Sequence, residues 1–314
     1  MIKNRQKTNK IKCEIRQPVV EFNNTYFISS VFVRQQGALC RFDKAESWVI
    51  LSPIEQRIKA KIEAVGTPLK DWDIQIYRGV LTGFNDAFII TGEKKDELIA
   101  ADPKSAEIIR PILRGRDIKR YGYDFADLWL INTHNGSKEK GVTPVNIDTY
   151  PAIKKHLDKF YPQLKKRADK GDTPYNLRNC AYMDDFYKQK IVWTPVNSEY
   201  RFTILKSGMF FNNSLFMITG ESLHYICALF NSKLYVFYLN LILSNEYAYG
   251  SGNVFGSIPL LKITEEQQQP IVELVESVLS KQNEDTSELQ TRIDDMVYEL
   301  FGFKDDEIAV IQSR

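Results

Sequence analysis

The chain has 314 residues, of which 43% are hydrophobic and 26% charged, and a formal net charge of +2. This is the composition of a soluble globular protein long enough for two domains, and it excludes a low-complexity or repeat chain. The four cysteines include no C-x-x-C pair, which argues against a zinc site or a disulfide framework and favours a reducing cytoplasm.

The small net charge conceals an uneven distribution along the chain. Residues 265–314 hold 13 acids and 4 bases, so the remaining 264 residues hold 27 acids and 38 bases. A basic body with an acidic tail indicates a face for a polyanion, with the tail kept away from it or directed at a protein neighbour.

Neither a signal peptide nor a membrane span is expected. The basic N-terminus has no apolar core behind it. The most apolar segment, residues 223–243, contains His224, Asn231, Lys233 and Asn240, which predicts one buried amphipathic helix.

The first half of the chain predicts short strands and helices in alternation. Residues 1–45 alternate apolar and polar side chains, which is typical of strands. Ser52 as N-cap, Pro53 at the first position and Gln56 near the capping-box site predict the start of a helix that runs to residue 65 and is ended by Gly66. Two strands are expected within 73–91 around a turn at 82–85, followed by a short helix over 93–101 and a strand over 126–133.

The second half predicts a long helix, a group of strands and a helical end. Residues 151–169 are expected to be helical, and 190–196, 200–205 and 209–219 to be strands. After the apolar helix, amphipathic helices are predicted over 265–280 and 286–301. The fold class is therefore α+β, with a mixed β-sheet body and a small C-terminal helical subdomain. The expected divisions are 1–47 as N-terminal strands or linker, 48–264 as the body and 265–314 as the acidic subdomain.

Most signatures of catalysis are missing from the sequence. It contains no dinucleotide or phosphate-binding glycine loop, no nucleophile elbow and only three, widely spaced histidines. One pattern stays open as an alternative: Asp86, Glu93 and Lys95 have the outline of a Mg²⁺-dependent nuclease site, in which two acids hold the metal and the lysine activates water. The sequence His134-Asn135-Gly136 is interpreted as a loop turn.

Two basic clusters indicate where a polyanion would bind. Residues 108–121, IIRPILRGRDIKRY, carry five basic side chains against one acid, and residues 154–170 carry seven bases against two acids. Basic side chains on one face bind phosphates by counterion release, and arginine and asparagine can also pair with guanine and adenine. The alternatives remain open that 154–170 is a solvated helix face and that the arginines of 108–121 form internal ion pairs.

Seven ordered sequence blocks resemble a known family. They are GVLTGFNDAFII (79–90), IIRPILRGRDIKRY (108–121), YPAIKKHLDKFYPQLKKRADKG (150–171), FFNNSLFMI (210–218), ICALFNSKLYVFYL (226–239), GSIPLLKI (256–263) and IDDMVYELFGFKDDEIAVI (293–311). The series, from about Trp48 to the C-terminus, resembles the TaqI-like C-terminal specificity domain, the target recognition domain of type IIG restriction-modification enzymes and related adenine-specific DNA methyltransferases.

The resemblance implies a module that reads a short duplex sequence, mainly in the major groove, for a catalytic domain or subunit. In that family the methyltransferase domain comes before this region and carries the S-adenosylmethionine loop and an Asn-Pro-Pro-Tyr motif, neither of which occurs here. S-adenosylmethionine and Mg²⁺ are thus expected only for that part, and no cofactor on this chain. A truncated gene, a split subunit and an expressed fragment are all compatible with this. The acidic helices would pack on each other or on the catalytic domain.

The resemblance and the basic clusters together predict three groups of DNA-contacting residues. The full set is Arg78, Thr82, Asn85, Arg114, Arg116, Lys119, Arg120, Lys165, Lys166, Arg167, Asn197, Tyr200, Arg201, Asn212, Asn213, Ser214, Tyr247 and Tyr249. The leading hypothesis is a DNA reader without activity of its own. The nuclease remains the alternative, and a third reading is a docking subunit whose basic face meets an acidic protein.

Overall fold

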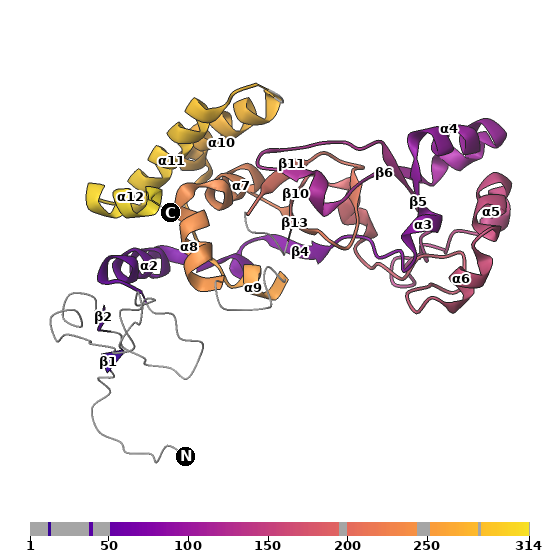
Figure 1. The fold of residues 1–314 in the computed structure, drawn as a ribbon, viewed down its shortest axis with the longest axis horizontal. Helices are drawn as coiled ribbons and strands as arrows, with labels where there is room; N and C mark the ends of the chain where they lie inside the picture. Colours follow the sequence, from indigo (N-terminus) through magenta and orange to yellow (C-terminus); the bar gives the residue numbers. More distant parts are fainter. Residues whose placement is uncertain are drawn as a thin grey trace, which may run out of the picture.

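The structure, a computed structural model, describes residues 12–13, 38–39, 51–194, 200–243, 252–281 and 284–313. Of the strands expected within 1–45, only the paired dipeptides β1 (Lys12–Cys13) and β2 (Ala38–Leu39) fall within these ranges, and the rest of that prediction lies outside them. The chain forms an elongated α+β fold (Figure 1), as predicted.

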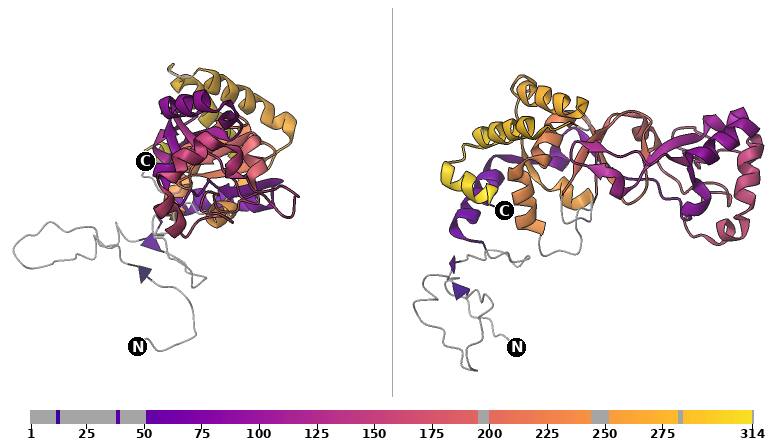
Figure 2. Two further views of the ribbon diagram at one scale, coloured as in Figure 1. Left: turned by 90° about the vertical axis from the view of Figure 1, so that its right-hand side faces the viewer. Right: turned by 45° about the horizontal axis from the view of Figure 1, so that its top comes forward.

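Helices lie at both ends of the molecule, with the sheets between them (Figures 1 and 2). In chain order the described helices are α2 (Pro53–Val65), α3 (Asn85–Phe88), α4 (Gly92–Ala101), α5 (Pro151–Asp158), α6 (Tyr161–Lys166), α7 (Leu223–Asn231), α8 (Lys233–Leu243), α9 (Gly252–Gly256), α10 (Glu265–Ser280), α11 (Ser287–Phe301) and α12 (Asp305–Gln312).

Two four-stranded sheets form the middle of the fold. The described strands after β2 are β3 (Gly66–Pro68), β4 (Ile74–Arg78), β5 (Ile89–Thr91), β6 (Ile109–Leu113), β7 (Ile118–Lys119), β8 (Gly122–Tyr123), β9 (Leu128–Ile131), β10 (Lys190–Trp193), β11 (Phe202–Leu205), β12 (Phe210–Phe211), β13 (Phe216–Gly220) and β14 (Pro259–Leu261). The central sheet has the order β11-β10-β13-β4 and is antiparallel throughout. The second sheet has the order β12-β6-β9-β5, in which only β12 and β6 are parallel.

The central sheet separates two hydrophobic cores. Because side chains alternate along a strand, Ile191 and Trp193 of β10 face one core while Val192 faces the other. The first core contains apolar residues of α2, α7, α8, α10, α11 and α12. The second contains those of the β6 sheet and of α3 to α6, which form the distal lobe on the right of Figure 1. Helices α10 to α12 therefore share one core with α2, α7 and α8.

The helix predicted over 53–65 is confirmed with Ser52 as its N-cap, but the partner in the capping box is Glu55 and not Gln56. The hydroxyl of Ser52 accepts the Glu55 N–H, and the Glu55 carboxylate accepts the Ser52 N–H, which together make a capping box. The two predicted C-terminal helices are also present as α10 and α11. The sequence analysis missed α12, which follows a left-handed turn at Gly302 (φ 62°).

Two of the expected helices are broken in two. The helix expected over 151–169 is α5 and α6, because Pro162 lacks the N–H that a continuous helix needs. The apolar helix over 223–243 is α7 and α8, bent by 68° at Ser232, whose hydroxyl donates to the Leu229 carbonyl (2.6 Å) and accepts the Tyr235 N–H (3.3 Å). Within the described residues no single helix is long and apolar enough to cross a membrane, and this bent pair meets the criterion only when its two halves are taken together.

Candidate nucleic-acid interface

One end of the central sheet gathers residues from distant parts of the chain. The register places Arg78 opposite Phe216, Phe216 opposite Trp193, and Trp193 opposite Phe202, so these four residues form a row across the sheet. The loops beyond this row carry many of the predicted DNA contacts. We define the sheet-end surface as Arg78, Arg116, Lys119, Asn212, Asn213 and Ser214.

Arg78 is the last residue of β4 and is exposed. Its Nε donates to the Asn213 carbonyl at 2.8 Å, and its guanidinium lies over the Phe216 ring at 5.7 Å from the centroid. These contacts orient the side chain, and they leave its terminal nitrogens without a hydrogen bond to the described residues. Arginine in such a position can bind a phosphate or a guanine edge.

The turn at 212–214 is tied to the loop that follows β6. The Ser214 hydroxyl accepts the Gly115 N–H at 3.0 Å and donates to Asn212 Oδ1 at 2.5 Å. The Asn212 N–H donates to the Leu113 carbonyl at 3.1 Å. The side-chain amide of Asn213 has no hydrogen-bond partner in the part of the chain that the structure describes. Asn213 is therefore the asparagine of this turn that is free to pair with a base.

The arginines of 108–121 have different environments. Arg110 donates to the carbonyls of Ala106, Glu107 and Ile109 and to the Tyr187 hydroxyl, so its guanidinium is used internally. Arg114 forms a bidentate pair with Asp117, a hydrogen bond that raises the pKa of Arg114. Arg116, by contrast, is exposed and pairs with nothing among the described residues.

Lys119 and Arg120 also point different ways. Lys119 is exposed and pairs with Asp124 at 2.6 Å, a surface pair that costs little to exchange for a phosphate. The Nε and one terminal nitrogen of Arg120 are buried without a hydrogen-bond partner in the described ranges, and its guanidinium lies 5.7 Å from the centroid of the Tyr121 ring. Since the Tyr121 N–H donates to the Phe202 carbonyl, Lys119 lies beside β11.

Other predicted contacts lie in the distal lobe, away from this sheet end. Thr82 is buried and its hydroxyl donates to Asn85 Oδ1 at 2.6 Å, whereas Asn85 itself is exposed. Arg167 is only 7% exposed; its guanidinium donates to the carbonyls of Thr82, Asp169, Pro174 and Asn176, and it lies over Phe88. Arg167 thus joins the loops of the lobe, and we leave it out of the proposed interface. Lys165 and Lys166 are exposed at the end of α6.

The remaining predicted contacts cannot be placed in the same detail. Asn197, Tyr247 and Tyr249 lie outside the described residues. Tyr200 and Arg201 directly precede β11 at the same end of the central sheet, are half-buried and have partners of their own. Their contact with DNA stays a prediction.

No observation favours the nuclease alternative. Asp86 opens α3 and Glu93 opens α4, both exposed, and Lys95 pairs with Asp96 at 2.9 Å and lies 4.3 Å from the Trp129 centroid. Over the described ranges, no group of three or more His, Cys, Asp or Glu side chains is arranged to hold a metal ion.

The sequence reasoning missed two residues that shape this surface. Phe216 supports Arg78, and Asp117 withdraws Arg114 from solvent. Asp117 lies three residues after Arg114 in the sequence Arg114-Gly115-Arg116-Asp117, a spacing that offers a local acid partner. Phe216 offered no comparable signal, because its neighbour Arg78 is distant in sequence.

The fold is shared with restriction-modification enzymes. The type IIL restriction-modification enzyme MmeI, solved in complex with DNA, superposes with a TM-score of 0.58 and 16% identity over 76% of this chain and 34% of its own. The type IIG restriction endonuclease BpuSI gives a TM-score of 0.45 and 14% identity over 79% of this chain and 33% of its own. The chain spans about a third of the length of each enzyme. No curated protein matches the chain.

One segment of the sequence also matches a family model. Residues 110–260 match the model of the TaqI-like C-terminal specificity domain. The matched segment includes β6, the 114–117 loop, the 212–214 turn and the strands β10, β11 and β13. Arg78 and the helices from α10 onward lie outside it.

Proposed function

We propose that the chain is a target-recognition module that reads duplex DNA for a methyltransferase or endonuclease domain of a restriction-modification system. The observation that carries the proposal is the match of residues 110–260 to a specificity domain. The MmeI structure, described as a complex with DNA, supports the choice of ligand.

The sheet-end surface supplies the two kinds of contact that such a reader needs. Arg116 and Lys119 are exposed cations suited to phosphates, which give affinity without sequence preference. Among the described residues, the Asn213 amide and the terminal nitrogens of Arg78 have no hydrogen-bond partner, and both groups suit base edges in the major groove. Asn197, Tyr200, Arg201, Tyr247 and Tyr249 are proposed to add contacts from the neighbouring loops.

The chemistry itself is proposed to belong to the catalytic part. S-adenosylmethionine and Mg²⁺ would be held there, because this sequence has neither the cofactor loop nor the Asn-Pro-Pro-Tyr motif. The acidic helices α10 and α11 would repel the phosphate backbone of DNA, so the basic body alone would bind it.

Selection from a pool of randomised duplexes tests this function. The full chain is incubated with the pool at low salt, bound duplexes are recovered and amplified, and the cycle is repeated with the double variant Arg78→Ala/Asn213→Ala in parallel. We expect one short sequence to be enriched by the wild type and a weaker consensus from the variant. Recovery of duplexes without any enriched sequence would reject target recognition while leaving DNA binding intact.

A further inference from the structure

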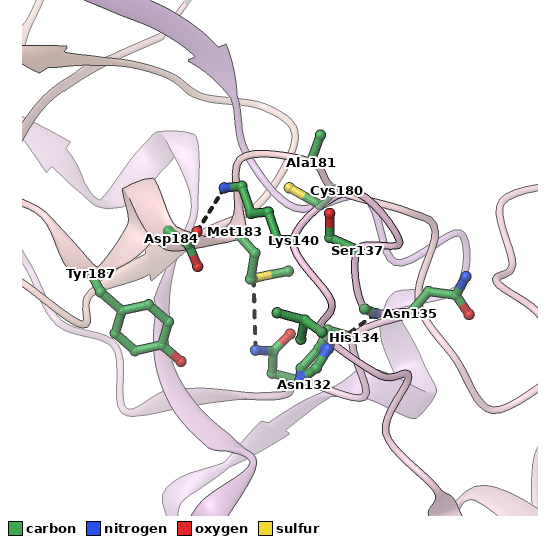
Figure 3. A pocket seen from close by; sticks show the side chains of 12 residues that line it. Asn132, His134, Asn135, Ser137, Lys140, Cys180, Ala181, Met183, Asp184 and Tyr187 are labelled. Atoms are coloured by element: carbon green, nitrogen blue, oxygen red, sulfur yellow. Dashed lines mark hydrogen bonds and ion pairs between the residues drawn. The ribbon is translucent and has the colours of Figure 1, made fainter.

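A small cavity is lined by residues other than those that define the sheet-end surface (Figure 3). It has a volume of about 140 Å³ and opens between the loop that follows β9 and the segment 180–187. Polar groups line one side and a thioether and a thiol the other. The residues that matter here are Asn132, His134, Ser137, Cys180, Met183 and Tyr187.

Asn132 presents an unused amide to this cavity. Its side chain is 3% exposed, its Oδ1 is buried without a hydrogen-bond partner in the described chain, and its Nδ2 meets only the Met183 sulfur at 3.9 Å. A buried amide without partners costs about 1–3 kcal/mol. Asn135, three residues further along the same loop, also lines the cavity, but its amide bonds to Asp172 and Asn179. The contrast indicates that the Asn132 amide is kept for a ligand.

His134 supplies a fixed donor beside that amide. Its Nδ1 accepts the Gly136 N–H at 3.1 Å, so the proton of the neutral ring sits on Nε2. Burial and the charge of Arg110 lower the pKa of His134, which keeps the ring neutral at pH 7. Gly136 makes this geometry possible, because its φ is 67° and a Cβ would lie 2.3 Å from the Val142 carbonyl.

The other walls suit a flat, largely uncharged ligand. Burial raises the pKa of the Cys180 thiol to about 11, so it is uncharged at neutral pH, and Met183 adds a polarisable surface that favours aromatic rings. Lys140 and Asp184 neutralise each other at 2.6 Å (Figure 3). The volume lies below the roughly 300–1,000 Å³ of pockets for drug-sized ligands, which points to a single base rather than a whole nucleotide.

We propose that this cavity binds an adenine base through the Asn132 amide. An asparagine amide pairs bidentately with adenine: its Oδ1 accepts a hydrogen bond from N6 and its Nδ2 donates one to N7. Adenine would therefore give both polar atoms of the Asn132 side chain a partner. The His134 Nε2–H then meets a further ring nitrogen, and Met183 contacts the face of the base. The base comes from a free adenosine or from an unpaired adenine of bound DNA. The proposal does not rest on the DNA-reading function, because a free nucleoside meets the same groups.

Titration of the full chain with adenosine is the first test, by calorimetry or saturation-transfer NMR. We expect binding to the wild type, at least about 10-fold weaker binding to Asn132→Leu, and weaker binding of 7-deazaadenosine, which lacks the N7 acceptor. Asn132→Leu removes an amide oxygen that is buried without a partner in the described chain, so the variant should have a Tm no lower than that of the wild type, which controls for folding. Gln189→Leu, an exposed side chain at another cavity, is the matched control.

A second titration identifies the source of the base. It uses a duplex with one unpaired adenine and the same duplex fully paired. If Asn132→Leu weakens binding only of the duplex with the unpaired adenine, the DNA supplies the base. If it weakens binding of adenosine alone, a free nucleoside supplies it. The proposal is overturned if Asn132→Leu changes neither titration, or if cytidine and uridine bind as well as adenosine. Loss of all duplex binding by the wild type leaves the adenosine result valid and counts against the proposed function instead.

Discussion

The carboxylate of Asp117 holds the guanidinium of Arg114 at two points, Nε–Oδ2 at 3.0 Å and Nη2–Oδ1 at 2.8 Å. The same carboxylate accepts the Arg114 N–H at 2.8 Å, and Asp117 is only 5% exposed. Three bonds to one buried carboxylate fix the 114–117 loop in place. The neighbouring Arg116 is exposed on this loop and has no such pair within the described ranges.

Arg114→Ala should therefore affect stability more than DNA affinity. Removing the guanidinium leaves the buried Asp117 carboxylate with fewer partners, which should lower the free energy of unfolding by about 2–4 kcal/mol. Urea denaturation measures this loss. Fluorescence anisotropy under native conditions should show the same salt dependence of duplex binding as the wild type, and a slope that is reduced as far as by Arg116→Ala would contradict a structural role.

Ser214→Ala should loosen the reading turn without removing a charge. The hydroxyl bonds both to Gly115 and to Asn212, so its loss frees the 212–214 turn from the 114–117 loop. We expect about 1 kcal/mol of destabilisation, an unchanged salt slope and reduced preference for the enriched sequence over its single-base variants. Ser207→Ala removes a hydroxyl that bonds only to the Tyr187 carbonyl among the described residues and should keep that preference. Equal preferences in the two variants would reject the turn as a reader.

Arg167→Met should destabilise the distal lobe strongly. The change removes the guanidinium donor from the carbonyls of Thr82, Asp169, Pro174 and Asn176, of which Asn176 still accepts the Gly171 N–H, at a position that is 7% exposed. A loss of about 3 kcal/mol or more in the free energy of unfolding is expected. The exposed neighbour Lys166→Ala is the control and should change it by less than about 0.5 kcal/mol. Similar losses in both variants would be inconsistent with the interior position of Arg167.

Glu307 makes the attachment of α12 to α2 dependent on pH. Burial raises the pKa of this carboxyl, but hydrogen bonds from Lys61, the Lys304 backbone and Arg57 outweigh it and lower the pKa from 4.5 to about 2. Because the folded-state pKa is lowered, the ionised Glu307 carboxylate stabilises the fold fully above pH 4.5. This stabilisation is lost as the pH falls through about 2. Glu307→Gln should therefore cost roughly 2 kcal/mol at pH 7, with allowance for the exposure of Arg57. Denaturation at several pH values should show this cost shrinking below pH 4.5, and a constant cost would contradict the assignment.

Local signals in the sequence predicted much of the fold. The helix over 53–65 rests on a capping box within four residues, and α10 and α11 on apolar stripes of their own. The break at Ser232 was not predicted, because a serine can lie inside a continuous helix or cap the start of a new one. The surrounding core decides between them, and that core is built from residues far apart in the chain.

The sequence indicated which residue types would form the candidate surface, but not which individual residues. Five basic side chains in 108–121 indicated a polyanion site. However, the Arg110 guanidinium donates its hydrogen bonds to backbone carbonyls and to the hydroxyl of Tyr187, which is 77 positions away. Thr82 was expected to contact DNA, but it is buried beside Arg167, 85 positions away. Only the fold shows that the Arg110 guanidinium has such long-range partners, whereas Arg116 has none among the described residues and Lys119 has only its exposed pair with Asp124.

The salt dependence of duplex binding tests the central claim most directly. Each phosphate that a cation neutralises adds about 0.9 to the slope of log affinity against log salt. The double variant Arg116→Ala/Lys119→Ala should therefore bind the enriched duplex with a slope reduced by about 2, whereas Arg292→Ala, an exposed arginine on α11, should match the wild type. Identical slopes for all three proteins would show that DNA does not contact the sheet-end surface.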